Sequence, residues 1–215
     1  MSEIVVAVDG PAGSGKSSVS KQAALQLGFG YLDTGAGYRA LTLTALKNQL
    51  ALETVGDLPL ESIFPYAIST DPTNYWVRVG FEDVTEGIRS MEVELNVSKV
   101  AAQPKVRSFM RNLTRSIASG CQMPGIIVEG RDITTVVLPD AKTRVLLTAS
   151  EEVRLARRAV DLQADGSISA QVSDRDKKDS KVVDFLNPAP GVKLLDTTDL
   201  SFEGSVAALV DLINH

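Results

Sequence analysis

The sequence predicts one α/β domain organised around a parallel β-sheet. Short apolar, β-branched runs alternate with helical patterns along the 215 residues, and most of these runs are too continuously apolar to be half-exposed strands. A glycine-rich segment follows the first run directly and opens into a helical pattern. A chain of this length can bury a substantial core, so a single domain with a small insert accounts for it.

Five apolar runs are predicted to form the strands of the sheet. They are Ile4–Val8, Phe29–Leu32, Gly125–Val128, Arg144–Thr148 and Lys193–Leu195. Four helices are predicted between or after them: from about Gly15 to Leu27, from Val106 to Ile117, after Ser150 and after Ser201. Gly28 is placed to end the first helix in a left-handed cap, and Ser150 can cap the start of the third.

Two segments do not follow this alternation of strand and helix patterns. From about Asp57 to Arg89, an alternation of Tyr75, Val77, Val79 and Phe81 is typical of an antiparallel strand, which predicts a small β-rich insert over about 57–89. From about 165 to 191 the chain is densely charged and then rich in proline, which predicts a mobile lid segment that closes over the site. The core then comprises about 1–56, 90–164 and 192–215.

Composition limits the possible functions. The 22 basic and 27 acidic residues give a net charge of −5, which argues against a general nucleic-acid or membrane-surface role. Cys121 is the only cysteine, so no intramolecular disulfide can form, and no apolar run reaches the length of a membrane span. We therefore expect a cytoplasmic protein. The only histidine is His215, which argues against histidine-based catalysis and histidine-rich metal sites.

The glycine-rich segment has the spacing of a phosphate-binding loop. Gly10-Pro11-Ala12-Gly13-Ser14-Gly15-Lys16-Ser17 fits G-x-x-x-x-G-K-[ST], with a strand pattern before it and a helix pattern after it. In such a loop backbone N–H groups surround a polyphosphate, the lysine reaches its β and γ oxygens, and the serine hydroxyl binds Mg²⁺. The pattern predicts a P-loop NTPase fold. A dinucleotide-binding fingerprint is excluded by the spacing.

Triphosphate binding alone does not distinguish a switch, a motor and a kinase. The guanine-reading pattern N-K-x-D is absent from the sequence. Motor ATPases usually carry an apolar run that ends in an acidic residue. In this sequence the nearest match is Ile126-Ile127-Val128-Glu129, which is weak support for a motor.

A second anion site is predicted at the carboxyl ends of the strands, where open α/β sheets place their active sites. Polar residues that follow strands would meet there, namely Asp33, Arg39, Glu129, Arg131 and Asp132. Arg107 lies at the start of a helix, and Arg175 lies in the charged segment. These residues favour a nucleotide monophosphate as the phosphoryl acceptor. The second pKa of its phosphate is about 6, so near neutral pH no basic side chain is needed to remove a proton from it.

The same motifs resemble those of the bacterial cytidylate kinase family. The segments that carry the resemblance are "IVVAVDGPAGSGKSSVSKQAA", "YLDTGAGYRALTL", "GFEDVTEGIR", "NVSKVAAQPKVR", "VEGRDITTVVLPDA" and "SDRDKKDS", and they cover most of the chain. The resemblance implies a nucleoside monophosphate kinase fold with a five-stranded parallel core, a CMP-binding β insert and a lid. It also implies Mg²⁺-dependent phosphoryl transfer from ATP to CMP or dCMP by a monomer.

Matching the motifs residue by residue implies a role for each position. Lys16, Asp33, Arg131 and Arg175 would be catalytic, and Ser18 and Arg157 would join the loop in binding ATP. The CMP phosphate would contact Thr34, Arg39 and Arg131; cytosine would contact Ser98, Arg107 and Asp132; and the sugar would contact Arg175 and Asp179. Ser17 would bind Mg²⁺, and Asp33 would lie near it, acting directly or through water. As a single aspartate, Asp33 could equally cap the following helix.

The sequence departs from the family pattern at several positions. Lys181 and Val182 follow "SDRDKKDS" where the family usually has a second lid arginine, so we expect this change to affect turnover and lid closure more than fold or substrate. Thr134 replaces a glycine, and Gly37 replaces a large apolar residue. Two other functions stay open: a phosphate-loop kinase for a small hydroxylated metabolite with Asp33 as base, and a nucleotide-dependent regulatory protein.

Overall fold

A parallel five-stranded sheet forms the centre of the molecule in the computed structural model, which describes residues 4–161 and 187–215. The strands lie in the order β2-β6-β1-β7-β8. Their bounds are Ile4–Asp9 for β1, Gly30–Asp33 for β2, Gly125–Gly130 for β6, Thr143–Thr148 for β7 and Lys193–Asp196 for β8. All five predicted strands are confirmed, and so is the α/β class with a parallel sheet.

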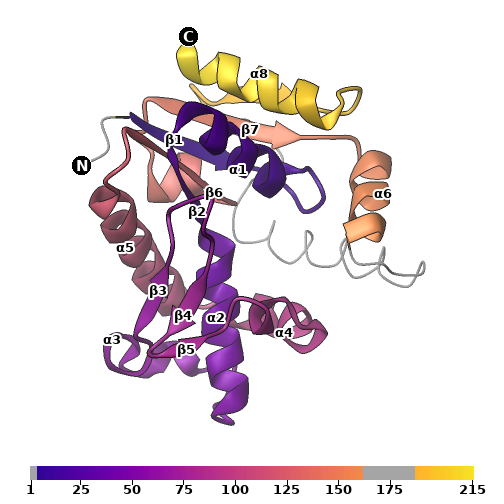
Figure 1. The fold of residues 1–215 in the computed structure, drawn as a ribbon. Helices are drawn as coiled ribbons and strands as arrows, with labels where there is room; N and C mark the ends of the chain where they lie inside the picture. The colour runs from indigo at the N-terminus through magenta and orange to yellow at the C-terminus, as the bar shows by residue number, and fades with distance from the viewer. Residues whose placement is uncertain (1–3, 162–186) are drawn as a thin grey trace.

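Helices cover both faces of this sheet (Figure 1). On one face lie α1 (Lys16–Leu27) and α8 (Phe202–Asn214), and on the other lie α2 (Thr34–Lys47) and α5 (Pro104–Gly120). Successive residues of β1 point to opposite faces, so Val6 and Val8 join the core under α1 while Ala7 joins the core under α2. Both faces are buried, which is why the strand is apolar at every central position.

The ends of the predicted helices follow ordinary capping chemistry. Gly28 ends α1 in a left-handed conformation with φ 66°. Helix α6 (Glu151–Asp161) starts after Ser150, whose hydroxyl accepts a hydrogen bond from Val153 N, and Ser201 caps α8 in the same way. The helix predicted over Val106–Ile117 is α5, which begins two residues earlier because Pro104 occupies its first position.

The insert forms a second, antiparallel sheet at the far end of α2 (Figure 1). Its strands are β3 (Tyr66–Ile68), β4 (Val77–Val79) and β5 (Glu82–Asp83). Short helical segments flank them: η1 (Val55–Asp57), α3 (Leu60–Ile63) and η2 (Gly87–Arg89), followed by α4 (Met91–Ala101). The β-rich segment was predicted, whereas α4 was not, although Ser90 followed by Glu92 and Glu94 is a typical helix start.

The predicted alternation from Tyr75 to Phe81 is wrong at its end. Strand β4 stops at Val79, and Phe81 is fully exposed. Gly80 has a φ of 60°, a left-handed conformation that turns the chain back into β5. The side chain of Phe81 therefore lies at the tip of a hairpin and does not join the buried face.

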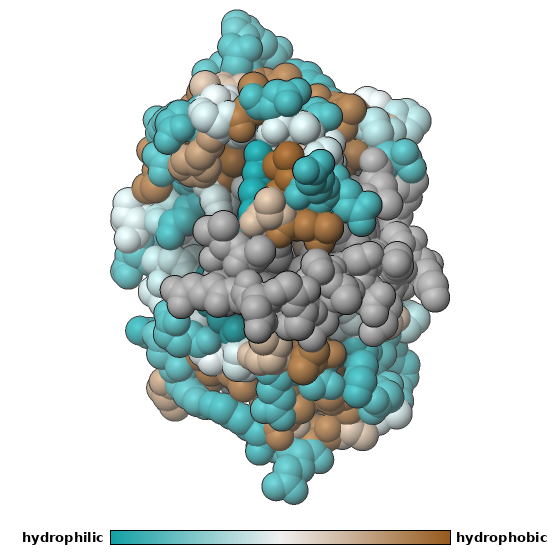
Figure 2. Space-filling view, turned by 90° about the vertical axis from the view of Figure 1, so that its right-hand side faces the viewer, coloured by the Kyte–Doolittle hydropathy of each residue, from teal (hydrophilic) through white to brown (hydrophobic). Residues whose placement is uncertain are grey.

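The described surface carries its apolar side chains in separate patches among hydrophilic ones on the face shown in Figure 2. Among residues 4–161 and 187–215, no helix is both long enough and apolar enough to span a bilayer.

Candidate active site

The carboxyl ends of three neighbouring strands bring the predicted site residues to one edge of the sheet. Strand β6 pairs with β1 on one side and β2 on the other, so that Glu129 lies opposite both Val8 and Asp33. The loop after β1 and the start of α2 after β2 therefore flank Glu129. This is the arrangement that the strand pattern predicted.

The phosphate-binding loop connects β1 to α1. Gly13 and Gly15 have φ values of 73° and 87°, which a residue with a side chain rarely adopts. A Cβ at Gly13 would also lie 2.3 Å from the carbonyl oxygen of Arg154. Within the described part of the chain, no side chain caps the start of α1, which leaves its first N–H groups for an anion.

Arginines of α6 hold this loop from the outside. Arg157 Nη1 donates to the carbonyl oxygen of Ser14 at 3.2 Å and to Thr197 Oγ1 at 3.0 Å, so this predicted ATP-side residue does lie at the loop. Arg154 Nη1 donates to the carbonyl oxygen of Ala12 at 3.0 Å, a contact that the sequence analysis did not anticipate. Ser18 is exposed on the first turn of α1.

Glu129 joins the loop to the sheet edge. Ser17 Oγ donates to its carboxylate at 2.7 Å, Tyr31 Oη donates to it at 3.2 Å, and Lys16 Nζ lies 3.8 Å away. Only 2% of Glu129 is exposed, and this burial raises its pKa while the Lys16 ammonium opposes the shift. The sequence analysis placed Glu129 at this sheet edge but gave it no role in binding or catalysis. The apolar run that ends in this acid was the signal for it.

Asp33 caps α2, which is the second role that the sequence left open for this residue. Its Oδ1 accepts a hydrogen bond from Ala36 N at 3.1 Å, and its Oδ2 accepts one from Arg39 Nη2 at 2.7 Å. Both residues are largely buried. Arg39 Nε is buried too, and it has no hydrogen-bond partner among the described residues. Thr34 Oγ1 donates to the carbonyl oxygen of Glu129 at 2.9 Å, which ties the start of α2 to β6.

Two of the predicted cytosine contacts meet in an ion pair. Arg107 Nη2, from the first turn of α5, lies 2.5 Å from Asp132 Oδ2, just after β6. Burial raises the pKa of Asp132, and the Arg107 guanidinium opposes the shift. Arg131 immediately follows β6, and Ser98 is half-buried on α4. The structure therefore places Arg107 and Asp132 together, although 25 residues separate them in the sequence.

Asp9 anchors the segment that carries Arg131 and Asp132. Its carboxylate accepts hydrogen bonds from Ile133 N, Thr134 N and Thr134 Oγ1, at 2.8, 2.8 and 2.6 Å. Residues Ile133–Val137 then form a single π-helical turn, η3. The threonine that replaces the family's usual glycine thus supplies one more hydrogen bond to a buried acid.

Removing that hydroxyl should destabilise the protein. In Thr134→Val the shape of the side chain is kept, but the buried Asp9 loses one charge-assisted hydrogen bond, so we expect the free energy of unfolding to fall by about 1.5–3 kcal/mol. Urea denaturation measures this. Thr42→Val is the matched control, because the buried Thr42 hydroxyl donates only to the helical carbonyl of Tyr38, and its loss should cost about 0.5 kcal/mol. Equal losses in the two variants would contradict the prediction.

The space beside Gly37 is filled by other side chains. A Cβ at this position would lie 3.3 Å from Met110 Sδ and 3.7 Å from Tyr66 Cζ. The missing large residue therefore leaves no gap, because α5 and the insert supply the apolar volume. The predicted lid residues Arg175 and Asp179, together with Lys181 and Val182, lie outside the described residues, as does most of the predicted lid.

Comparison with known proteins gives one consistent result. The family model described as Cytidylate kinase matches residues 6–215. A Streptomyces griseus protein named cytidylate kinase is 40% identical over 216 residues, covering 99% of this chain and 93% of that protein. A Rhodococcus opacus protein of the same name is 41% identical, covering 100% and 96%. A crystal structure of a Thermus thermophilus protein superimposes with a TM-score of 0.51 at 18% identity, covering 98% of both chains, and supports the fold alone.

Proposed function

The chain belongs to the cytidylate kinase family, and on that premise we propose that it transfers the terminal phosphoryl group of ATP to CMP or dCMP, releasing ADP and CDP or dCDP. The observation that carries the proposal is the presence of two anion-binding regions at one sheet edge. The phosphate loop with Lys16 lies on one side of Glu129, and Thr34 with Arg39 lies on the other.

ATP would bind with its phosphates in the loop Gly10–Ser17. Helix α1 begins at Lys16, which would contact the β and γ oxygens, and Ser18 and Arg157 would complete this side. Arg157 holds the carbonyl of Ser14, so its contribution is to fix the shape of the loop as well as to add positive charge.

The oxygen atoms around Ser17 fit a magnesium ion. Mg²⁺ usually binds one or two protein oxygens and keeps several waters together with substrate phosphates. The Ser17 hydroxyl donates a hydrogen bond to Glu129, which leaves the lone pairs of its oxygen for a cation, and the Glu129 carboxylate can orient bound waters. The described residues contain no cluster of three or more acidic, histidine or cysteine ligands. When bound, the ion would neutralise charge on the phosphates being separated.

Asp33 is the second carboxylate proposed for this region. Its two oxygens accept hydrogen bonds from Ala36 N and Arg39, and each keeps a second lone pair, so a contact with the metal would be made directly or through water. We propose that its main contribution is to hold Arg39 in place. The ion pair fixes Nη2 and leaves Nε for a ligand.

CMP would bind with its phosphate at Thr34, Arg39 and Arg131 and its base at Arg107, Asp132 and Ser98. Cytosine presents an amino donor beside ring acceptors, so a carboxylate can accept from the amine while arginine and serine donate. Uracil presents a carbonyl and an N–H at these positions and fits less well. The insert over about 57–89 would bind this side. A lid over about 165–191, with Arg175 and Asp179 at the sugar, stays a prediction, as do the monomeric state and the cytoplasmic location.

Transfer needs positioning and charge neutralisation more than proton removal. The acceptor phosphate is already largely dianionic near neutral pH, since its second pKa is about 6. Lys16, Arg39 and Arg131 supply positive charge to the two phosphate groups that must approach each other.

ADP release from MgATP tests the proposal. We expect the rate to depend strongly on CMP or dCMP, and to be far lower with UMP, AMP, GMP or a panel of small alcohols. Dependence on an alcohol would instead indicate a metabolite kinase, and release that no acceptor stimulates would indicate a nucleotide-dependent regulatory protein.

A further inference from the structure

Tyr75 lies where the insert meets the main sheet. The residue lies two positions before the start of β4 at Val77, and its ring packs against both hydrophobic cores. Its ring centroid is 5.6 Å from Lys21 Nζ of α1. The same segment covers the open edge of β2, because the carbonyl oxygen of Thr70 accepts a hydrogen bond from Tyr31 N at 2.9 Å. Tyr75 therefore reaches from the insert to the region of the site residues on β2.

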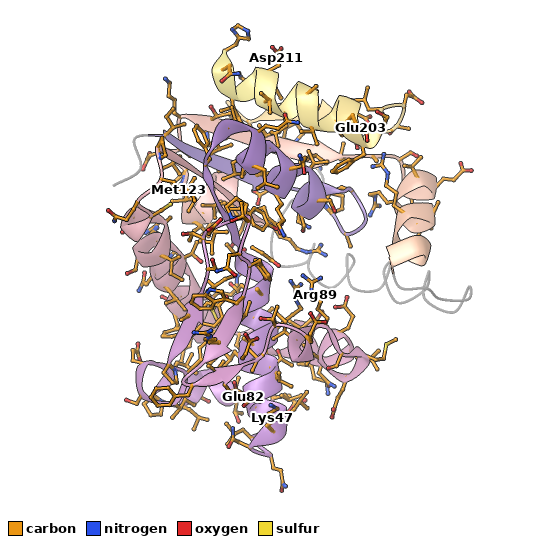
Figure 3. The ribbon with its side chains drawn as sticks, viewed as in Figure 1. Lys47, Glu82, Arg89, Met123, Glu203 and Asp211 are labelled. Carbon is orange, nitrogen blue, oxygen red and sulfur yellow. The ribbon has the colours of Figure 1, made fainter. Side chains whose placement is uncertain are left out.

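The hydroxyl of Tyr75 is buried, and it forms no hydrogen bond with any described residue. Asp33, Arg39, Arg89 and Glu129 are near enough to influence it, and Arg89 lies between α1 and α4 in the view of Figure 3. Burial raises the pKa of Tyr75, and the Asp33 carboxylate adds to the shift, so the phenol keeps its proton and can act as a donor.

Two comparisons within the site show that this hydroxyl is unusual. Tyr31, also buried beside Glu129, donates its hydroxyl to the Glu129 carboxylate at 3.2 Å. Arg39 Nε shares the property of Tyr75 Oη, since it is a buried donor with no described partner. Among the described residues Ser14 Oγ and Ser20 Oγ are also buried without a partner, but of these four groups only Arg39 Nε and Tyr75 Oη belong to the surroundings of the Asp33–Arg39 ion pair.

Buried donors are nearly always hydrogen-bonded in folded proteins, because water cannot satisfy them and leaving them unpaired is unfavourable. Phenylalanine would fill the same apolar volume without that cost. The presence of a tyrosine at position 75, with its hydroxyl unpaired near a predicted anion site, is accounted for if a bound ligand supplies the hydrogen-bond acceptor. Phosphate oxygens are strong acceptors with several lone pairs, and one phosphate group can accept from both donors.

We propose that the Tyr75 hydroxyl, together with Arg39 Nε, donates a hydrogen bond to the phosphate of the acceptor nucleotide. Tyr75 is then a substrate-binding residue contributed by the insert to the phosphate region, whereas Arg107 and Asp132 face the base. The proposal rests on the proposed function, because it takes the acceptor to be a nucleoside monophosphate.

The test is Tyr75→Phe, which removes only the hydroxyl. We expect the dissociation constant for CMP, measured by titration calorimetry, to rise about 10-fold or more, as for loss of a hydrogen bond to a charged group. The dissociation constant for an unreactive MgATP analogue should stay within about twofold of wild type. The melting temperature of the ligand-free variant should not fall, because the hydroxyl has no partner to lose. Tyr31→Phe is the matched control and should lower the melting temperature, since it breaks an existing hydrogen bond.

Three results would overturn the inference. The first is unchanged CMP affinity in Tyr75→Phe, and the second is a loss confined to the MgATP analogue. The third is a melting temperature lowered as far as in Tyr31→Phe, which would assign the hydroxyl to an internal hydrogen bond. Failure of the proposed function is a separate observation: the wild-type protein itself would then not bind CMP.

Discussion

Replacing Lys16 with alanine should lower kcat by about 10³-fold or more with CMP and with dCMP alike. Lys16 Nζ lies 3.8 Å from the buried Glu129 carboxylate, and only 15% of the Lys16 side chain is exposed. Charge that develops on the transferred phosphoryl group would lose its fixed counter-charge. Steady-state ADP release at saturating MgATP measures the effect, with circular dichroism to confirm that the variant is folded.

Lys47→Ala provides the matched control for this substitution. Lys47 pairs with Glu82 on the surface of the insert side, and Figure 3 shows both residues at the end of the molecule remote from α1. Its removal should leave kcat within about twofold, since exposed ion pairs contribute little. If Lys16→Ala retained more than about a tenth of wild-type kcat, the assignment of Lys16 to the reacting phosphates would be wrong.

Asp132→Ala should abolish most of the preference for CMP over UMP. The carboxylate is 13% exposed and paired with Arg107, so a cytosine amine that reaches it gains a hydrogen bond to a charged group in a partly desolvated site. Such a bond contributes about 1.5–3 kcal/mol, which corresponds to about a 10- to 150-fold fall in kcat/KM for CMP. The value for UMP should change far less, because uracil has no amine to donate.

Asp132→Asn and Asp57→Ala make this second prediction more specific. An asparagine amide can donate to a uracil carbonyl as well as accept, so the Asn variant should use UMP relatively better than the Ala variant does. Asp57 forms an exposed pair with Lys105, and its removal should leave the CMP-to-UMP ratio unchanged. An Asp132→Ala enzyme that still discriminated fully would mean that other residues read the base.

Local sequence pattern accounts for most of the scaffold. The strands were predictable because their central residues are mostly apolar, and in β1, β2 and β6 the burial of both faces requires this. The phosphate loop was predictable because glycine is needed at positive φ at Gly13 and Gly15, and this need appears directly as spacing. Ser150 and Ser201 marked helix starts for an equally local reason, since a cap bonds to a backbone N–H only three residues away. The hairpin at Gly80 is the one feature here that the local pattern predicted wrongly. The apolar alternation continues past Gly80 to Phe81, although the positive φ of Gly80 turns the chain there.

The sequence by itself therefore determined the α/β fold and the spacing of the glycine-rich loop, and family resemblance supplied the residues that we predict for the second anion site. Only the tertiary structure decided how these groups are paired. The register of β6 against β2 and β1 places Glu129 beneath Ser17, the approach of α5 to the end of β6 pairs Arg107 with Asp132, and the insert brings Tyr75 to the sheet edge. Such contacts join residues far apart in the chain, and their hydrogen bonds and burial arise only when separate elements pack together, so no local pattern encodes them.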